Sequence, residues 1–185
     1  EDYDVATWVK VSDVWICTKA RLEKQLSKHE SDWRAITLGL ADYVNKNNFE
    51  SVIIGLSGGL DSAAVAAIAV DALGPGRVWC VMMPSIYTSD DSLGDAQLCI
   101  SSLGCRYDVV SIKPAIEAYE AMLGTLFKDH EIDLTEENLQ SRARAIVLMG
   151  MSNKFGPMVV TTGNKSEMAV GYATLYGDMC GGFNP

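Results

Sequence analysis

The sequence predicts an α/β protein built on a doubly wound parallel sheet with helices on both faces. Segments of strand length alternate with segments of helical periodicity over most of the 185 residues. The run at 78–83 is also apolar without interruption, which is typical of a strand that helices cover on both sides. In such a sheet, ligands bind in the crevice at the carboxyl ends of the strands.

The helices are predicted from apolar residues spaced three and four positions apart and from polar residues at their ends. A first amphipathic helix covers 32–46, where we expect a packing or dimer contact. Ser89 opens a later helix as its N-cap, and Thr135 is the expected N-cap of the last one. These two helices are expected over 89–103 and 135–154, and two others over 63–73 and 114–127.

Short apolar runs bounded by glycine or proline predict the strands. The first begins at Val52, and the others are expected over 78–83, 107–112 and 158–161. Residues 1–30 are harder to interpret. They hold a short apolar patch and then a charged stretch, 18–30, in which Leu22 and Leu26 favour a helix with a thin apolar stripe.

We therefore divide the chain into an N-terminal segment or linker of unknown role, 1–30, and one domain, 31–185.

The composition, with 48% hydrophobic and 21% charged residues, is typical of a globular protein. A net charge of -9 argues against a nucleic-acid or anionic-membrane surface, because both need a basic field. The five cysteines form no Cys-x-x-Cys motif, so we expect reduced packing thiols and a cytoplasmic location. No run reaches transmembrane length, no signal peptide is visible, and the chain does not begin with Met.

A glycine-rich turn directly follows the first strand and precedes an alanine-rich helix. Its residues are Gly55, Leu56, Ser57, Gly58, Gly59, Leu60, Asp61 and Ser62. The free N–H groups of a helix N-terminus favour an anion, and glycines let a phosphate approach the backbone. The two hydroxyls add donors, and the carboxylate could hold a metal ion that bridges to the same phosphates. The turn therefore predicts a polyphosphate site.

Other nucleotide and hydrolase motifs fit this turn less well. A Walker A loop needs a lysine, but none stands between Asn48 and Lys113, and the Rossmann glycine pattern is absent. Residues 55–59 do match the Gly-x-Ser-x-Gly nucleophile elbow of serine hydrolases. That chemistry needs a downstream histidine, and the one available, His130, lies in a polar stretch expected to be a solvated loop. A glycine turn without any ligand is the remaining structural alternative.

A second polar segment, 161–178, follows the last strand and should lie beside the first loop. The pattern Ser-Gly-Gly-x-Asp-Ser resembles the N-type ATP pyrophosphatases. Together with Glu-Glu-Asn-Leu-Gln-Ser-Arg-x-Arg and Asn-Lys-Ser-Glu-Met-Ala-Val-Gly-Tyr-x-Thr-Leu-Tyr-Gly-Asp, it resembles the synthetase domain of NAD synthetase, particularly the glutamine-dependent bacterial form. The resemblance runs from about residue 32 to residue 185.

This resemblance implies an ATP-dependent carbon–nitrogen ligase. The family adenylates the nicotinate carboxylate of deamido-NAD, releases pyrophosphate, and lets ammonia displace AMP to give NAD. It implies that 55–62 and Thr162 bind ATP, and that Asp61 and Glu167 are the catalytic pair that holds Mg²⁺. Met82 and Met83 lie where adenine should pack, although core packing explains them equally well.

The resemblance also assigns residues to deamido-NAD and implies a homodimer, because the family binds this substrate across a two-fold interface. The residues assigned to deamido-NAD are Asn138, Arg142, Tyr172, Leu175 and Asp178. Arg144 lies about 200° around the helix from Arg142, so a solvated ion pair is an alternative role for it.

Some features depart from the family pattern. The chain stops at Pro185, where the family continues into a lysine-bearing loop that closes on the triphosphate, so we expect this fragment to be weakly active or inactive. No glutaminase domain is present, which places glutamine hydrolysis on another part of the full-length protein. Ile86 stands where a basic residue is expected. GMP, asparagine or argininosuccinate synthetases, a serine hydrolase, and a non-catalytic nucleotide-binding or dimerisation module remain as alternatives.

Overall fold

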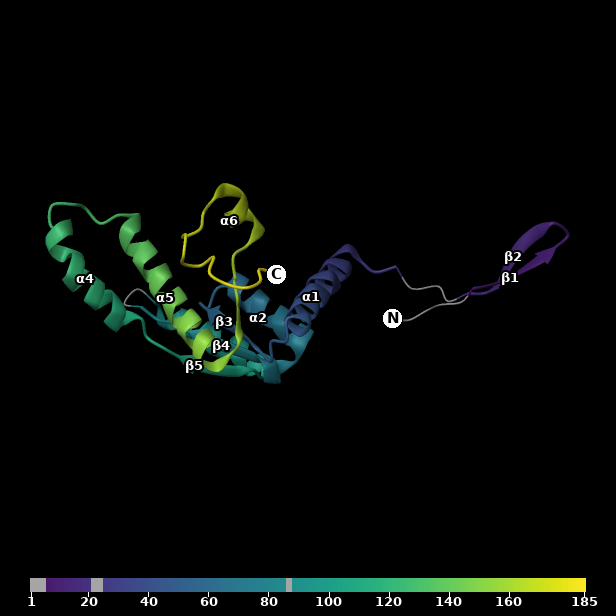
Figure 1. The fold of residues 1–185 in the computed structure, drawn as a ribbon, viewed down its shortest axis with the longest axis horizontal. Coiled ribbons are helices and arrows are strands. Elements are labelled where there is room, and N and C mark those ends of the chain that lie inside the picture. The colour runs from purple at the N-terminus through teal and green to yellow at the C-terminus, as the bar shows by residue number, and fades with distance from the viewer. Residues whose placement is uncertain (1–5, 21–24, 86–87) are drawn as a thin grey trace. The chain divides into compact units, whose positions relative to one another are not determined.

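A computed structural model describes residues 6–20, 25–85 and 88–185. Four parallel strands form the central sheet of the larger part of the chain, in the order β5-β4-β3-β6 (Figure 1). Their bounds are β3 Val52–Leu56, β4 Val78–Met82, β5 Arg106–Val109 and β6 Met158–Val160. In register, Val52 lies opposite Val78 on one side and Met158 on the other. The predicted parallel sheet is confirmed.

Helices cover both faces of this sheet, as predicted. Alternate strand residues point to opposite faces, and the two sets belong to different buried clusters. Val52 and Ile54 pack with residues of α1 (Lys28–Lys46), α2 (Leu60–Leu73) and α3 (Asp90–Leu103). Ile53 packs with residues of α4 (Lys113–Phe127) and α5 (Leu134–Phe155). Because neither face of β3, β4 and β6 meets water, these three strands contain no polar alternation, whereas β5 at the edge carries the exposed Arg106.

Some element ends differ from the prediction. The strand expected over 107–112 ends at Val109. After it, two isolated backbone hydrogen bonds continue the pairing, from Val110 N to Met82 O and from Ile112 N to Pro84 O. The N-cap of α5 is Asp133 rather than Thr135. Asp133 Oδ1 accepts from Thr135 N at 2.7 Å, and Glu136 Oε2 accepts from Asp133 N at 2.9 Å, so the pair forms a capping box.

Two short elements were not predicted. A 3-10 turn, η1 (Pro75–Arg77), occupies the Gly-Pro-Gly connection, and a six-residue helix, α6 (Lys165–Val170), follows β6. Beyond α6, residues 181–183 return alongside β6, where Gly182 N donates to Val159 O and Thr161 N donates to Phe183 O. This return packs the last described segment against the carboxyl end of the sheet.

The first part of the chain is a β-hairpin. Strands β1 (Thr7–Val11) and β2 (Val14–Lys19) are antiparallel and are joined by Ser12 and Asp13, both with positive φ. The helix expected over 18–30 is wrong for 18–19, which belong to β2, and for 25–27, which are not helical, whereas 28–30 form the start of α1. The rest of that stretch before α1, 21–24 with Leu22, lies outside the described residues. Alternating β-branched and aromatic residues favour the strands instead.

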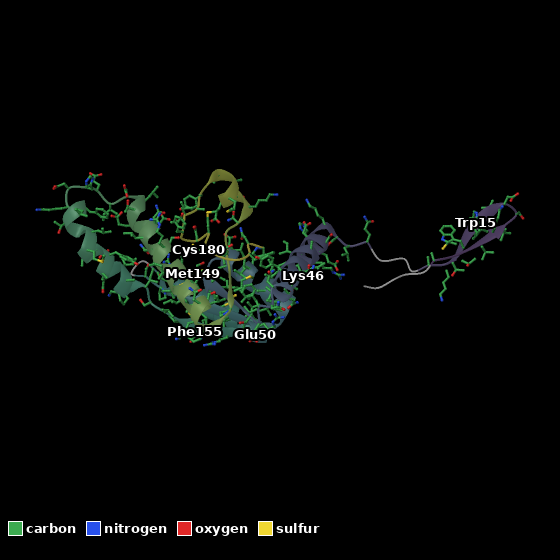
Figure 2. The ribbon with its side chains drawn as sticks, viewed as in Figure 1. Trp15, Lys46, Glu50, Met149, Phe155 and Cys180 are labelled. Atoms are coloured by element: carbon green, nitrogen blue, oxygen red, sulfur yellow. The ribbon has the colours of Figure 1, made fainter. Side chains whose placement is uncertain are left out.

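The chain divides into two compact units, 1–32, which contains the hairpin, and 33–185. Trp15 of β2 is 63% exposed and can be found on the hairpin in Figure 2. Among the described residues, none of the helices combines the length and the apolarity that crossing a lipid bilayer requires.

Candidate nucleotide site

The two polar segments lie at the carboxyl ends of neighbouring strands. β3 is flanked by β4, the next strand along the chain, and by β6, the last one. The chain runs from β3 to β4 and β5 on one side and then crosses to β6 on the other side of β3, and open α/β sheets bind their ligands at such a switch point. The glycine-rich turn follows β3, and the segment 161–178 follows β6, so both belong to this edge.

A hydrogen-bond network within the turn fixes its shape. Ser57 N donates to Ser62 Oγ at 3.2 Å, and Gly59 N donates to Ser57 Oγ at 3.1 Å. Ser62 Oγ in turn donates to Gly59 O at 3.0 Å, and the Ser62 side chain is buried. Ser62 thus supports the turn from inside, whereas Ser57, Gly59 and Asp61 face solvent.

The N-terminus of α2 is open. Its N-cap, Gly59, offers no side chain to the first N–H groups, and Leu60 in the first turn is 85% exposed. Unpaired N–H groups at a helix start form an anion site together with the positive end of the helix dipole. Residues 55–62, here called the phosphate loop, therefore have a geometry that can accept a phosphate.

Asp61 and Glu167 are brought together through one residue, Asn164. Asn164 Nδ2 donates to Asp61 Oδ2 at 3.2 Å. Asn164 N donates to Glu167 Oε2 at 2.9 Å, and Glu167 N donates back to Asn164 Oδ1 at 2.9 Å. The two carboxylates come from the first turns of different helices, α2 and α6, yet both bond to Asn164 beside the open N-terminus of α2.

The chemistry of these groups fits Mg²⁺. This ion is held by one or two carboxylates, with water and substrate phosphates completing its octahedron. Within the described ranges, no group of three or more His, Cys, Asp or Glu is placed to hold a metal. A Mg²⁺ at Asp61 and Glu167 would therefore need water or phosphate oxygens as further ligands.

A cavity of about 500 Å³ opens at this edge of the sheet. Thr162 and Ser57 line it, together with Met82 and Met83 at the end of β4. One wall is a stripe of α5, formed by Leu134, Glu137, Asn138, Ser141, Arg144, Ala145 and Leu148. The expected adenine-packing methionines thus do face a cavity, although both are also buried in the core.

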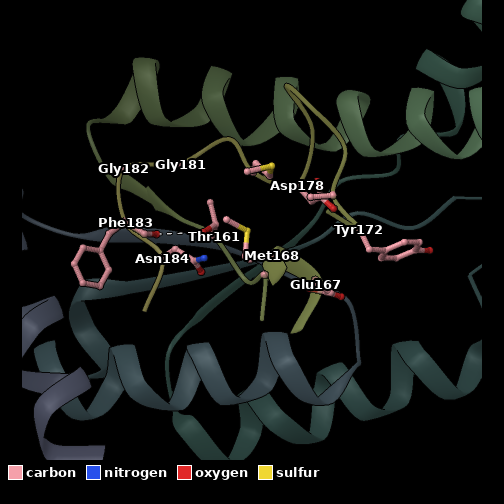
Figure 3. A pocket seen from close by; sticks show the side chains of 12 residues that line it. Thr161, Glu167, Met168, Tyr172, Asp178, Gly181, Gly182, Phe183 and Asn184 are labelled. Carbon is pink, nitrogen blue, oxygen red and sulfur yellow. Dashed lines mark hydrogen bonds between the residues drawn. The ribbon is translucent and has the colours of Figure 1, made fainter. Parts of the chain in front are cut away.

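A second, smaller cavity of about 190 Å³ adjoins the larger one and shares Thr161, Tyr172, Ala173 and Asp178 with it. Glu167, Asp178 and Phe183 line it, and Thr161 Oγ1 donates to Phe183 O at 3.4 Å at its edge (Figure 3). The carboxylate of Glu167 therefore stands beside this space rather than in the larger cavity.

The residues expected to bind deamido-NAD form one hydrogen-bonded cluster. The hydroxyl of Thr174 donates to Asn138 Oδ1 at 2.9 Å, and Arg142 Nε donates to Leu175 O at 3.2 Å. Asp178 Oδ1 accepts from Thr174 N at 2.7 Å. These bonds hold the loop 172–178 against α5.

Two further contacts complete the cluster. Tyr172 donates its hydroxyl to Glu137 Oε1 at 3.3 Å, and the nearby Glu137 charge raises the pKa of Tyr172. Asp178 N donates to Ser141 Oγ at 3.0 Å. Glu137, Ser141 and Thr174 were not singled out from the sequence, because their role depends on this loop returning to α5.

Arg144 is the residue whose environment differs most from expectation. Its Nε donates to Met83 O at 3.3 Å, and burial lowers its pKa. It forms no ion pair with any described residue, and it lines the larger cavity. The alternative role in a solvated ion pair is therefore wrong. Arg144 lies three residues after Ser141 and four residues before Leu148, so it is on the same face of α5, the face that lines the cavity. This spacing is the sequence signal that could have revealed the position of Arg144.

The geometry does not favour a serine hydrolase. The Ser57 hydroxyl lies 3.0 Å from Ser62 Oγ. His130 is exposed and lies in the turn that follows α4, where its backbone N–H donates to Phe127 O. Ile86, the expected departure from the family pattern, lies outside the described residues.

A Ser-Gly-Gly loop after β3, with two carboxylates meeting beside it at the switch point of a parallel sheet, defines the N-type ATP pyrophosphatase fold. Within that class the sequence is more specific. The chain belongs to the NAD synthase family, whose model matches residues 32–185.

Individual relatives agree with this family. The sequence is 56% identical to the glutamine-dependent NAD(+) synthetase of Rhodobacter capsulatus, over 84% of this chain and 28% of that protein. The structure is similar to that of the glutamine-dependent NAD+ synthetase of Acinetobacter baumannii in complex with ADP, with a TM-score of 0.91 and 42% identity over 97% of this chain and 34% of that one. It is also similar to the NMN synthetase of Francisella tularensis, with a TM-score of 0.77 and 29% identity over 87% of this chain and 65% of that one. The chain thus spans less than a third of the length of the curated relatives it matches.

Proposed function

We propose that this chain is the ATP-pyrophosphatase part of a glutamine-dependent NAD synthetase. It activates the nicotinate carboxylate of deamido-NAD by transferring AMP to it from ATP, and ammonia then displaces AMP to form the amide. Activation is needed because a free carboxylate would have to expel oxide, whereas an acyl adenylate expels AMP. The observation that carries the proposal is the meeting of Asp61 and Glu167 at Asn164, beside the open N-terminus of α2.

The ATP site in this proposal combines the phosphate loop with the larger cavity. Residues 55–62 cradle the phosphates through backbone N–H groups, and Thr162 adds a hydroxyl at the cavity wall. Met82 and Met83 pack against the adenine. Asp61 and Glu167 would hold Mg²⁺, which neutralises charge on the leaving pyrophosphate when bound.

Deamido-NAD is proposed to bind at the cluster on α5, through Asn138, Arg142, Tyr172, Leu175 and Asp178. The hydrogen bonds among these residues support the idea that they act as one surface. Leu175 is 63% exposed, and its neighbour Tyr176 is 73% exposed. Exposed apolar groups beside a substrate site support a homodimer in which the partner covers this surface.

The source of ammonia and the location of the protein are also proposed. Relatives about three times longer, named as glutamine-dependent, support a glutaminase domain elsewhere in the full-length protein. Five free cysteines support a reducing, cytoplasmic environment. The acidic net charge supports the absence of nucleic-acid and membrane partners.

The decisive experiment uses the complete protein that contains this chain, with ATP, Mg²⁺, ammonium chloride and deamido-NAD carrying labelled oxygen in its carboxylate. We expect pyrophosphate, NAD and AMP that has gained one labelled oxygen, since the carboxylate attacks the α-phosphate. Release of ADP, or AMP without label, would contradict the adenylate. The deamido form of NMN serves as the competing substrate, and a preference for it would move the chain toward NMN synthetases such as the relative from Francisella.

A further inference from the structure

Asn164 uses both ends of its side-chain amide, one within its own helix and one outside it. The Oδ1 atom accepts from Glu167 N and so caps α6. The Nδ2 atom donates to Asp61 Oδ2, at the start of α2. Serine, threonine or aspartate could provide the cap, but none of them offers an amide donor for the second bond.

The cap matters because α6 is only six residues long. So short a helix is not stable by its own propensity and depends on its ends. The capping box at Asn164 holds the start, and Gly171 in the left-handed conformation closes the end through its bond to Glu167 O. The orientation of Glu167 therefore depends on Asn164.

Both carboxylates are left with one oxygen available. Asn164 N occupies Glu167 Oε2, and Asn164 Nδ2 occupies Asp61 Oδ2. Among the described residues, no hydrogen bond reaches Glu167 Oε1 or Asp61 Oδ1. The two N–H donors of Asn164 also offset the repulsion between carboxylates that share one small region.

We propose that Asn164 is a positioning residue, which holds Asp61 and Glu167 in one orientation so that one oxygen of each can reach a shared Mg²⁺–phosphate group. It acts through these carboxylates and does not itself touch the substrate. The proposal rests on the metal-binding role given to Asp61 and Glu167 in the proposed function. Removal of such outer-shell partners costs about 10–100-fold in metal affinity in other proteins.

The test compares Asn164→Ser, Asp61→Asn and a control, Asn153→Ser, in the complete protein. Asn153 is exposed near the end of α5, away from the site. Mn²⁺ binding is measured by electron paramagnetic resonance with a non-hydrolysable ATP analogue, and hydrogen exchange reports on α6. For Asn164→Ser we expect Mn²⁺ affinity to fall about 10–100-fold while the Glu167 and Met168 amides keep their protection, because serine still caps the helix.

The outcomes separate this proposal from the proposed function. If Asp61→Asn loses Mn²⁺ binding but Asn164→Ser binds like the control, the metal site stands and the role of Asn164 is overturned. Loss of Mn²⁺ affinity that appears only together with loss of α6 protection also overturns it, because Asn164 would then be a cap and nothing more. If neither variant changes Mn²⁺ binding, the metal role of Asp61 in the proposed function fails and this proposal fails with it.

Discussion

A β-carbon on Gly58 would lie 2.3 Å from the carbonyl oxygen of Ser92. Ser92 belongs to the first turn of α3, whose backbone is therefore packed directly on the phosphate loop. Gly58 also has a φ of +84°, a region that side chains other than glycine rarely adopt. The glycine is thus required both for conformation and for space.

We predict that Gly58→Ala displaces the loop from α3 and weakens ATP binding by about tenfold or more, since the strain of a forced backbone is about 1–3 kcal/mol. Isothermal titration calorimetry measures the affinity. The matched control is Gly76→Ala, because a β-carbon there meets nothing within 4 Å and φ is not positive. Equal ATP affinity in the two variants would contradict the prediction.

Arg144 should be the main cationic contact for a bound anion in the larger cavity. It is the only arginine or lysine among the described residues that line this cavity. Arg144→Gln removes a charge-assisted hydrogen bond worth about 1.5–3 kcal/mol, so ATP, which the proposed function places in this cavity, should bind about tenfold more weakly or worse. Thermal unfolding should change little, because the variant also relieves the burial of a charge without an ion-pair partner.

Arg142→Gln is the comparison for Arg144. Its guanidinium bonds to Leu175 O on the loop and does not line the larger cavity. We therefore expect it to affect deamido-NAD affinity while leaving ATP affinity unchanged. Binding measured separately for the two substrates decides the matter, and identical effects of the two variants would argue against distinct roles.

Gly177 allows the loop 172–178 to approach α5. A β-carbon there would lie 2.3 Å from Ser141 Oγ and 2.9 Å from Thr174 Cβ. Gly177→Ala should release the loop, so that its amides exchange with solvent about tenfold faster and deamido-NAD binds more weakly. Gly150→Ala on α5 is the control, since its β-carbon meets nothing within 4 Å and alanine favours a helix. An unchanged exchange rate in Gly177→Ala would refute this account of the loop.

Cys80 should be unreactive in the folded protein. Its side chain is fully buried in β4, and burial, reinforced by Cys105 at a sulfur–sulfur distance of 3.8 Å, raises the pKa of the Cys80 thiol far above the ordinary value. Iodoacetamide should therefore label the exposed Cys17 well before Cys80. Mass spectrometry of timed samples shows the order, and early labelling of Cys80 would count against the burial.

The same pKa shift makes stability depend on alkaline pH. The folded state holds the Cys80 proton more tightly than the unfolded chain, so the free energy of unfolding is unaffected below the ordinary thiol pKa and falls as pH rises through and above it. Cys80→Val should remove part of this slope in urea titrations. A slope that the substitution leaves unchanged would assign it to other groups.

Local patterns in the sequence were sufficient for the parts of the fold that burial determines. β3 and β4 were predicted because strands covered on both faces contain only apolar residues, and the phosphate loop because only glycines allow its turn. The hairpin at 7–19 was missed because its exposed strands carry no buried face to mark them. The six-residue α6 was missed because it depends on a cap rather than on a hydrophobic stripe.

By itself, the sequence determined the parallel α/β architecture, and it predicted that the Ser-Gly-Gly turn, Asp61 and Glu167 lie at one edge of the sheet. Tertiary structure alone decided that Asn164 joins these two carboxylates, that Arg144 faces the cavity, and that the loop 172–178 returns to α5. The reason is physical: periodicity and turn chemistry depend on neighbours in the chain, whereas the direction of a polar side chain depends on which distant group can satisfy its hydrogen bonds once the elements have packed.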